Sequence, residues 1–298
     1  MLIKAVLGVM LALTVYFAIV FFMDYAKVSK EGKLESNNFF ALGTVGFVTN
    51  FFDTLGIGSF APTTALLKMF KLSGDRTIPG TLNVACTIPV VVEALIFITV
   101  IKVEPVTLVA LLASATVGAY FGAGFVSKLD ERKVQLGMGI ALIAVVLTML
   151  AGQLNLMPVG GTEIGLTGGK LIIGIVGNLI LGALMTLGIG LYAPCMALVF
   201  ALGMSAKVAF PIMMGSCAFL MPVAAAKFVK EGAYDRKASM AITIFGVVGV
   251  LIAAYIVKEL PLNILKWLVD AVIVYTSIMM FKSANQKKKK QHNSVKEV

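Results

Sequence analysis

Two short segments of this sequence carry the same residues at the same spacing, in a pattern suited to ligand binding. Residues 54–66 read TLGIGSFAPTTAL and residues 186–198 read TLGIGLYAPCMAL, with nine of the thirteen positions identical and an offset of 132 residues. Each has a G-x-G triplet, which permits backbone conformations that other residues avoid and lets a ligand approach closely. A proline follows four residues later, and proline suits the first turn of a helix. We therefore expect an apolar helix to break at each triplet and a new helix to begin, near Ser59–Pro62 in the first segment.

A helix that begins inside a membrane protein presents free N–H groups and the positive end of its dipole, which together attract anions. Neither segment contains lysine or arginine, so dipoles and neutral donors would hold the anion, as suits reversible binding of a small oxyanion. The alternative is that the glycines only allow close helix packing, but their repetition together with A-P favours a site. The candidate substrate-binding residues are Gly56, Gly58, Ser59, Pro62, Thr63, Gly188, Gly190, Tyr192, Pro194, Cys195 and Asn83. For Cys195 the alternative is apolar packing, and for Asn83 it is an interhelical hydrogen bond.

Two acidic residues lie within apolar segments. Asp53 precedes the first triplet and Glu93 lies deep in the segment 78–101, and the repeat places Met185 and Ala225 at the corresponding positions. Ionisable groups at membrane depth are costly and often functional, so both are candidates for carrying a coupling proton. The structural alternatives are a hydrogen bond that fixes the hairpin for Asp53 and a partnered or cavity-facing carboxyl group for Glu93.

The composition is that of a membrane protein. Of 298 residues, 59% are hydrophobic and 13% are charged, and the mean hydropathy is +0.97. Apolar runs of about 20 residues fit spanning helices rather than an outer-membrane barrel. The net charge of +10 lies in short loops and in the tail KKKKQHNSVKEV, where it indicates helix orientation rather than nucleic-acid binding.

Several kinds of chemistry find no support in the sequence. The three cysteines lie in apolar segments without CxxC spacing, and the one histidine, His292, lies in the polar tail. We therefore expect no disulfide framework, no metal, no cofactor and no Ser-His-Asp arrangement. A GxxxxGK[ST] motif and a TVGYG filter are also missing, so the sequence indicates neither an ATPase nor a potassium channel.

The apolar segments predict a set of spanning helices and two unusual regions. The first segment, 2–22, is long for a signal peptide and is expected to be a retained spanning helix. The other spans are predicted at 78–101, 106–127, 134–151, 206–229, 238–257 and 262–282. Residues 39–71 and 171–204 each have two apolar arms of about 12–16 residues, too short for a ~30 Å hydrocarbon core. Each is either one broken spanning helix or a re-entrant hairpin.

The basic residues favour hairpins. If both regions are hairpins, 19 of the 25 lysines and arginines share one face, whereas two spanning regions would give 15 and 10. The positive-inside rule then predicts a cytoplasmic C-terminus and an external N-terminus in the cell membrane. A hairpin plus three crossings is an odd number, so the second repeat must be inverted relative to the first, as in many secondary transporters.

The predicted fold is an all-α polytopic membrane protein with two inverted repeats and one extra N-terminal transmembrane helix. Each repeat comprises a re-entrant or broken helical hairpin and three transmembrane helices. The divisions are 1–38 for the first helix and a basic loop, 39–151 for repeat 1, 152–170 for a linker, 171–282 for repeat 2 and 283–298 for a basic disordered tail.

These segments resemble the sulfite exporter TauE/SafE family over residues 39–282. The resemblance rests on the tips GIGSFAP and GIGLYAP, each followed by an apolar arm, a polar turn and a proline-containing helix, SGDRTIPGTLNVACTIP and SAKVAFPIMMGSCAFLMP. It implies a permease for sulfite, thiosulfate, organosulfonates or other small organic anions. Tips in that family often read GxGGG, whereas here Ser59 and Phe60, or Leu191 and Tyr192, replace two glycines.

We therefore expect a secondary permease for a small sulfur oxyanion or organosulfonate, with a small anion and the lipid bilayer as partners and no nucleic acid. A carrier for small carboxylates, an anion channel and a membrane-embedded enzyme are the alternatives. The lack of a nucleophile–base arrangement argues against the enzyme. The sequence leaves transport direction, coupling ion and oligomeric state open.

Overall fold

The computed structural model describes residues 2–97, 102–156, 161–188, 190–256, 267, 270, 271 and 273–286. Within these ranges the chain is helical and contains no strand, apart from an isolated β-bridge between Glu163 and Met204. The helices are α1 (Leu2–Lys30), α2 (Phe39–Thr54), α3 (Phe60–Met69), α4 (Ile78–Phe97), α5 (Pro105–Val126), α6 (Glu131–Gln153), α7 (Gly168–Met185), α8 (Tyr192–Ala201), α9 (Ala206–Lys230) and α10 (Arg236–Ile256). Residues 273–286 are also helical and are called the C-terminal helix below.

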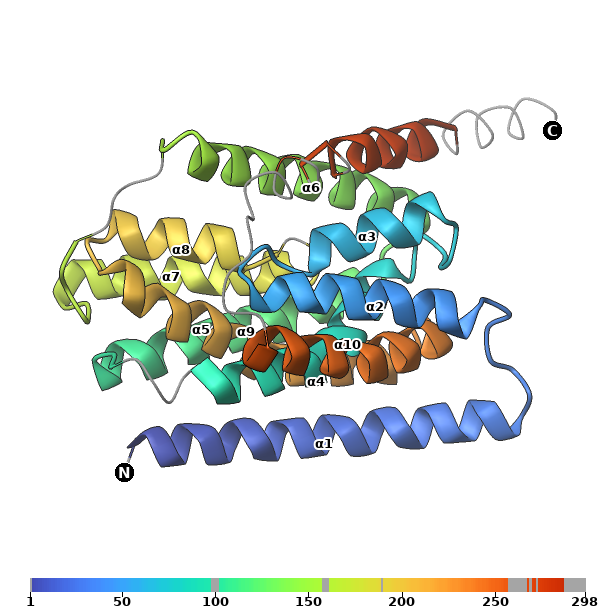
Figure 1. Cartoon of the computed structure of the whole chain (residues 1–298), viewed down its shortest axis with the longest axis horizontal. Coiled ribbons are helices and arrows are strands. Elements are labelled where there is room, and N and C mark those ends of the chain that lie inside the picture. The colour runs from blue at the N-terminus through green and yellow to red at the C-terminus, as the bar shows by residue number, and fades with distance from the viewer. Residues whose placement is uncertain are drawn as a thin grey trace.

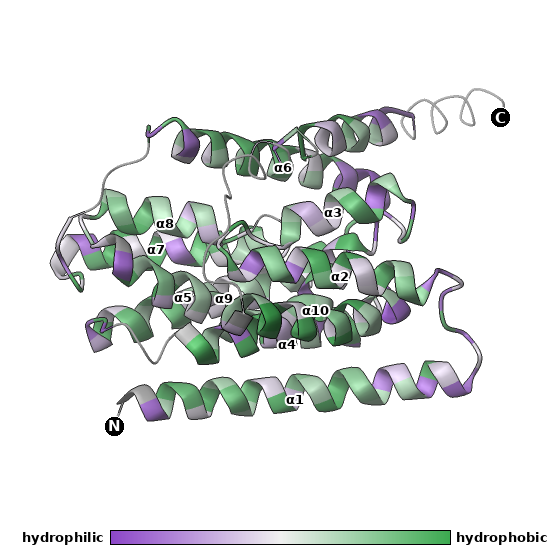
Figure 2. Ribbon diagram, viewed as in Figure 1, coloured by the Kyte–Doolittle hydropathy of each residue, from purple (hydrophilic) through white to green (hydrophobic). Residues whose placement is uncertain are grey.

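Seven of these helices, α1, α4, α5, α6, α7, α9 and α10, are long and apolar enough to cross a membrane, counted over the described residues. Most of the helices are rich in hydrophobic residues along their length, as Figure 2 shows, and many large apolar side chains are exposed on them. Lipid tolerates such a surface, and helices satisfy their own backbone hydrogen bonds there. The expectation of a polytopic helical membrane protein is confirmed.

The core is built around α4 and α9. In each of these helices 83% of the residues of an 18-residue apolar stretch are buried, whereas the value is 22% for α1, which lies at the edge of the molecule (Figure 1). Glycines allow the surrounding helices to cross closely. A Cβ atom on Gly182 of α7 would lie 2.1 Å from the carbonyl oxygen of Ala115 on α5. Such small-residue contacts bring helix backbones together in membranes, where no hydrophobic force drives helices to associate.

The first unusual region, α2 and α3, is a hairpin. The side chain of Asn37, just before α2, donates a hydrogen bond of 2.9 Å to the carbonyl oxygen of Leu72, just after α3. The chain therefore enters and leaves at the same end of the molecule. Asn38 caps α2 by accepting from the N–H groups of Phe40 and Ala41.

The second unusual region, α7 and α8, is also a hairpin, with its base at the opposite end. The N–H of Gly161 donates to Met204 O at 3.0 Å, and the N–H of Ser205 donates to Glu163 O at 2.9 Å. The segment after α4 joins this base, because Glu104 N donates to Ile164 O. Since α4 begins just after the first hairpin, it runs from one base to the other, and the two tips meet between them (Figure 1).

The hairpin arms differ from the expected lengths. Helices α3 and α8 have ten residues each, shorter than predicted, and α7 has eighteen because it begins at Gly168, inside the expected linker. The predicted span 262–282 lies partly outside the described residues, and the described C-terminal helix continues to residue 286. The inverted relation of the two repeats stays a prediction. An inverted relation requires the two hairpins to have their bases at opposite ends of the molecule, which is the arrangement described above.

Candidate functional site

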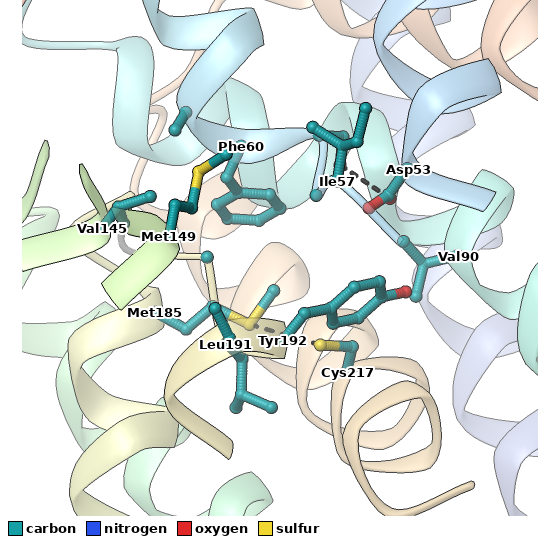
Figure 3. Close-up of a pocket in the computed structure, with 15 residues that line it drawn as sticks. Asp53, Ile57, Phe60, Val90, Val145, Met149, Met185, Leu191, Tyr192 and Cys217 are labelled. Atoms are coloured by element: carbon teal, nitrogen blue, oxygen red, sulfur yellow. Dashed lines mark hydrogen bonds between the residues drawn. The ribbon is translucent and has the colours of Figure 1, made fainter. Parts of the chain in front are cut away.

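The two hairpin tips meet at a small buried cavity of about 40 Å³ (Figure 3). Most of its lining comes in pairs separated by 132 residues, one member from each repeat. The pairs are Asp53 and Met185, Gly58 and Gly190, Ser59 and Leu191, Phe60 and Tyr192, and Ala61 and Ala193. The sequence repeat is therefore also a spatial one, and equivalent residues face the same cavity.

Both short helices begin at this cavity. Helix α3 starts at Phe60 and α8 starts at Tyr192, and neither preceding residue, Ser59 or Leu191, caps its helix with a side-chain hydrogen bond. The first turn of an α-helix has N–H groups without intrahelical acceptors. The free N–H groups at the starts of α3 and α8, and the positive ends of the two helix dipoles, therefore lie beside the same cavity.

The glycine triplets make these sharp turns possible. Gly56 and Gly58 have φ angles of +89° and +90°, and Gly188 has +98°, values that residues with a Cβ atom rarely adopt. Gly190 is not among the glycines with a positive φ, and no atom lies within 4 Å of the position where its Cβ would be. The first three glycines are required by the backbone, whereas Gly190 leaves room in the cavity.

Asp53 links the two arms of the first hairpin and also lines the cavity. Its Oδ2 atom accepts a hydrogen bond of 2.8 Å from the Ser59 hydroxyl, and its side chain is buried. This is the structural role that the sequence offered as an alternative. Because Asp53 also faces the cavity, the structural role and a proton-carrying role are compatible.

Glu93 joins the site through a tyrosine. It is fully buried in α4, and its Oε2 accepts a hydrogen bond of 3.0 Å from the Tyr192 hydroxyl. Its Oε1 has no hydrogen-bond partner in the described part of the chain. The carboxyl groups of Glu93 and Asp53 are close enough for their charges to interact, and no described residue that lines the cavity is basic.

A larger space of about 620 Å³, here called the vestibule, adjoins the small cavity. Both are lined by Ile57, Met149, Tyr192 and Ala193. The remaining vestibule residues come from the first tip, the end of α6, α8 and the C-terminal region; they are Gly56, Thr148, Gly152, Gln153, Asn155, Met196, Phe200 and Trp267. The vestibule thus leads from one end of the molecule to the hairpin tips.

The structure places only part of the candidate set at these spaces. Gly58, Ser59, Gly190 and Tyr192 line the cavity, and Gly56 lines the vestibule. The other candidates line neither space; they are Pro62, Thr63, Gly188, Pro194, Cys195 and Asn83.

Two of these other candidates have local partners instead. Thr63 donates a hydrogen bond to Thr49 on α2 at 2.9 Å, and Asn83 donates to the carbonyl oxygen of Pro79 one turn earlier. The partner of Asn83 lies within its own helix, so the interhelical bond considered for it is not the one observed. Any role of these residues in substrate binding stays a prediction.

Some lining residues were not among the candidates. Phe60 had a signal, since the repeat makes it the equivalent of Tyr192. Cys217 on α9 and Met149 on α6 had none, because no motif surrounds them. The Cys217 sulfur lies 3.8 Å from that of Met185, and both residues line the cavity (Figure 3).

A helical membrane protein whose two hairpins enter from opposite ends and meet at a buried site belongs, by its architecture, to the class of membrane transport proteins. The family model of the sulfite exporter TauE/SafE family matches residues 1–149 and 170–297. The chain therefore belongs to this family, which transports sulfur-containing anions across membranes. No curated protein and no solved structure matches it.

Proposed function

We propose that this protein is a secondary permease of the cell membrane for a small sulfur oxyanion or organosulfonate such as sulfite, bound between the hairpin tips. The observation that carries the proposal is that two uncapped helix starts, α3 and α8, face one buried cavity. Helix N-termini bind anions through free N–H groups and the helix dipole. Ser59 and Tyr192 also line the cavity, where their hydroxyl groups donate to Asp53 and Glu93 and so connect the two acids to the site.

We further propose that protons accompany the anion. Ser59 donates to Asp53, and the titratable groups around it are Glu93, Tyr192 and the thiols of Cys86 and Cys217; none of these described groups carries a positive charge. A carboxylate beside a bound anion would repel it strongly in this poorly hydrated site. A neutral carboxylic acid instead can donate a hydrogen bond to the anion. Binding of the anion therefore favours protonation of Asp53 or Glu93, which couples the two fluxes.

The distribution of basic residues orients the protein. The base of the first hairpin brings together the end of α1, the loop after α3 and the start of α10, through the contacts of Asp24 and Glu35 with Arg236 and of Asn37 with Asp235. Lys27, Lys30 and Lys71 lie in these segments. The positive-inside rule puts this end, with the C-terminus, in the cytoplasm and the N-terminus outside. The vestibule, at the opposite end, is then the external entrance.

The decisive experiment measures uptake of radiolabelled sulfite into proteoliposomes, with and without a pH gradient, in competition with thiosulfate, sulfoacetate and lactate. We expect saturable uptake that responds to the gradient and is inhibited by the sulfur-containing anions. Inhibition by lactate alone would indicate a carboxylate carrier, and flux without saturation would indicate a channel. Liposomes without protein serve as the blank, and the Gly190→Leu variant, which adds a side chain to the cavity, is expected to show no saturable uptake.

A further inference from the structure

A buried charged cluster lies outside the candidate site. The Lys68 ammonium group, at the end of α3, forms an ion pair with Asp75, and their side chains are only 13% and 10% exposed. The Gln135 side chain on α6 donates to the same Asp75 oxygen at 2.8 Å, and Lys68 also donates to the Ser283 hydroxyl at 3.1 Å. The cluster therefore joins the first hairpin, α6 and the C-terminal helix. We call these four residues the latch.

The latch lies at the opposite end of α6 from the vestibule. Along α6, Gln135 belongs to the latch, Val145 and Met149 line the small cavity, and Gln153 lines the vestibule. From Gln135 to Met149 a helix rises by ~21 Å. The path from the vestibule to the cavity, if continued in the same direction, would meet the latch.

The repeat relates the latch to the vestibule. At the offset of 132 residues, Lys68 corresponds to Phe200 and Gln135 corresponds to Trp267. Phe200 and Trp267 both line the open vestibule. Lys68 and Gln135 are thus joined through Asp75 at one end of the molecule. Their equivalents, Phe200 and Trp267, line the open vestibule at the other end.

Helix α6 and the C-terminal helix are held to each other at several points. The Ser277 hydroxyl donates to the carbonyl oxygen of Gly139 at 2.8 Å, and the Phe281 ring packs directly on Gly139. Gln153 at the end of α6 also donates to Asp270, which precedes the C-terminal helix in the sequence. In Figure 1 this pair of helices forms a layer along one side of the molecule, next to α3 and α8. A pair connected in this way can move as one body against the hairpins.

We propose that the latch is the gate at the Lys68 end of the transport path and that Phe200 and Trp267 form the corresponding gate at the vestibule end. The structure then represents the state in which the vestibule is open and the latch is closed. Movement of α6 with the C-terminal helix separates Gln135 and Ser283 from the first hairpin and brings Trp267 onto Phe200. Exchange of conformations between two related repeats is a general way to alternate access to a central site.

The test measures which face of the membrane gives access to the cavity. The reporters are the native Cys217 and an introduced Gly190→Cys, whose side chain enters open space. Each is treated in sealed vesicles with a membrane-impermeant sulfonate-bearing methanethiosulfonate, from one face and then from the other. Site-resolved mass spectrometry counts the label, with Cys217→Ala as the blank for the native thiol.

We expect Lys68→Met and Asp75→Asn to increase labelling from the Lys68 face by at least about tenfold, since removing one partner of a buried ion pair leaves a charge without compensation and favours the open gate. The reversed pair, Lys68→Asp with Asp75→Lys, should restore the native pattern. The matched control is Lys133→Met, which breaks an exposed ion pair with Asp130 at the start of α6. This variant should show the labelling pattern of the native protein.

Unchanged labelling from the Lys68 face in both single variants would overturn the latch, and so would an equal rise in the Lys133→Met control. Monodisperse elution and an unfolding temperature near that of the native protein identify variants that fold, and labelling from the vestibule face should fall as labelling from the Lys68 face rises. The labelling reaction needs no transported substrate. The labelling result can therefore contradict the latch without contradicting the proposed anion permease, and the uptake result can contradict the permease without contradicting the latch.

Discussion

The Tyr192 hydroxyl donates a hydrogen bond of 3.0 Å to Glu93, and this contact joins the tip of the second hairpin to a core helix of the first repeat. Neither partner has a polar equivalent, because the repeat places Phe60 opposite Tyr192 and Ala225 opposite Glu93. The same is true of Asp53 and Ser59, whose equivalents are Met185 and Leu191. The helix starts at the site are therefore duplicated, at Phe60 and Tyr192, whereas its acids and hydroxyls are each supplied by one repeat only.

Replacing Tyr192 by Phe keeps the ring and removes the donor to Glu93. We expect sulfite uptake to fall by about tenfold or more, and the free energy of unfolding to fall by about 1–3 kcal/mol, because a buried carboxyl group loses its partner. Uptake and thermal unfolding, followed by a dye that reacts with the buried cysteines, check both effects. Tyr255→Phe, at a position 69% exposed, is the control and should behave as the native protein.

Asp53→Asn separates the structural role of this residue from its charge. The amide oxygen still accepts the hydrogen bond from Ser59, so folding should be retained, but the side chain no longer exchanges a proton. We expect exchange of labelled for unlabelled sulfite to persist while the response of net uptake to a pH gradient is lost. Glu93→Gln tests the second acid in the same assay. A full gradient response in both variants would contradict proton coupling through this pair.

The glycines of the two tips should respond differently to substitution. Gly190→Leu adds a side chain in open space, so transport should be abolished while the unfolding temperature stays near that of the native protein. Gly58→Ala forces a Cβ atom onto a φ of +90°, which costs about 1–2 kcal/mol. If Gly190→Leu transports normally, the cavity between the tips is not the substrate site.

Close helix crossing at Gly182 predicts a large effect of one methyl group. A Cβ atom there would lie 2.1 Å from the Ala115 carbonyl oxygen, so Gly182→Ala must push α7 away from α5 and should destabilise the protein by about 1–3 kcal/mol. Thermal unfolding measures the loss. Gly8→Ala in α1, where no atom lies within 4 Å of the Cβ position, is the matched control and should be neutral or slightly stabilising.

Glu104 gives a prediction about pH. Its carboxylate accepts hydrogen bonds from the Thr107 hydroxyl and from the N–H groups of Thr107 and Val106 at the start of α5, and these bonds lower its pKa below the ordinary value of 4.5. The stability that the lowered pKa provides is present above pH 4.5 and is lost as the pH falls through the folded-state pKa. Glu104→Gln should therefore melt at a lower temperature at pH 7, with a smaller difference at pH 4, as measured by circular dichroism. An equal deficit at both pH values would show that the charge is not responsible.

The sequence alone predicted the membrane class, the positions of the broken helices and their hairpin form. These features depend on local properties of the chain, such as the length of apolar runs, the glycine and proline positions and the count of basic residues in short loops. Helix starts at Phe60 and Tyr192 follow the predicted breaks closely, because glycine and proline determine backbone conformation within a few residues.

Only the tertiary structure decided which side chains share the site. Thr63 and Cys195 lie close to the tips in sequence but line neither space: Thr63 donates a hydrogen bond to Thr49 on α2, and Cys195 is buried elsewhere. The direction of such side chains depends on how each helix is rotated when it packs. The contact of Tyr192 with Glu93 spans 99 residues, and that of Lys68 with Ser283 spans 215. Such pairs carry no local signal, because they form only when the packing of distant helices brings their side chains together.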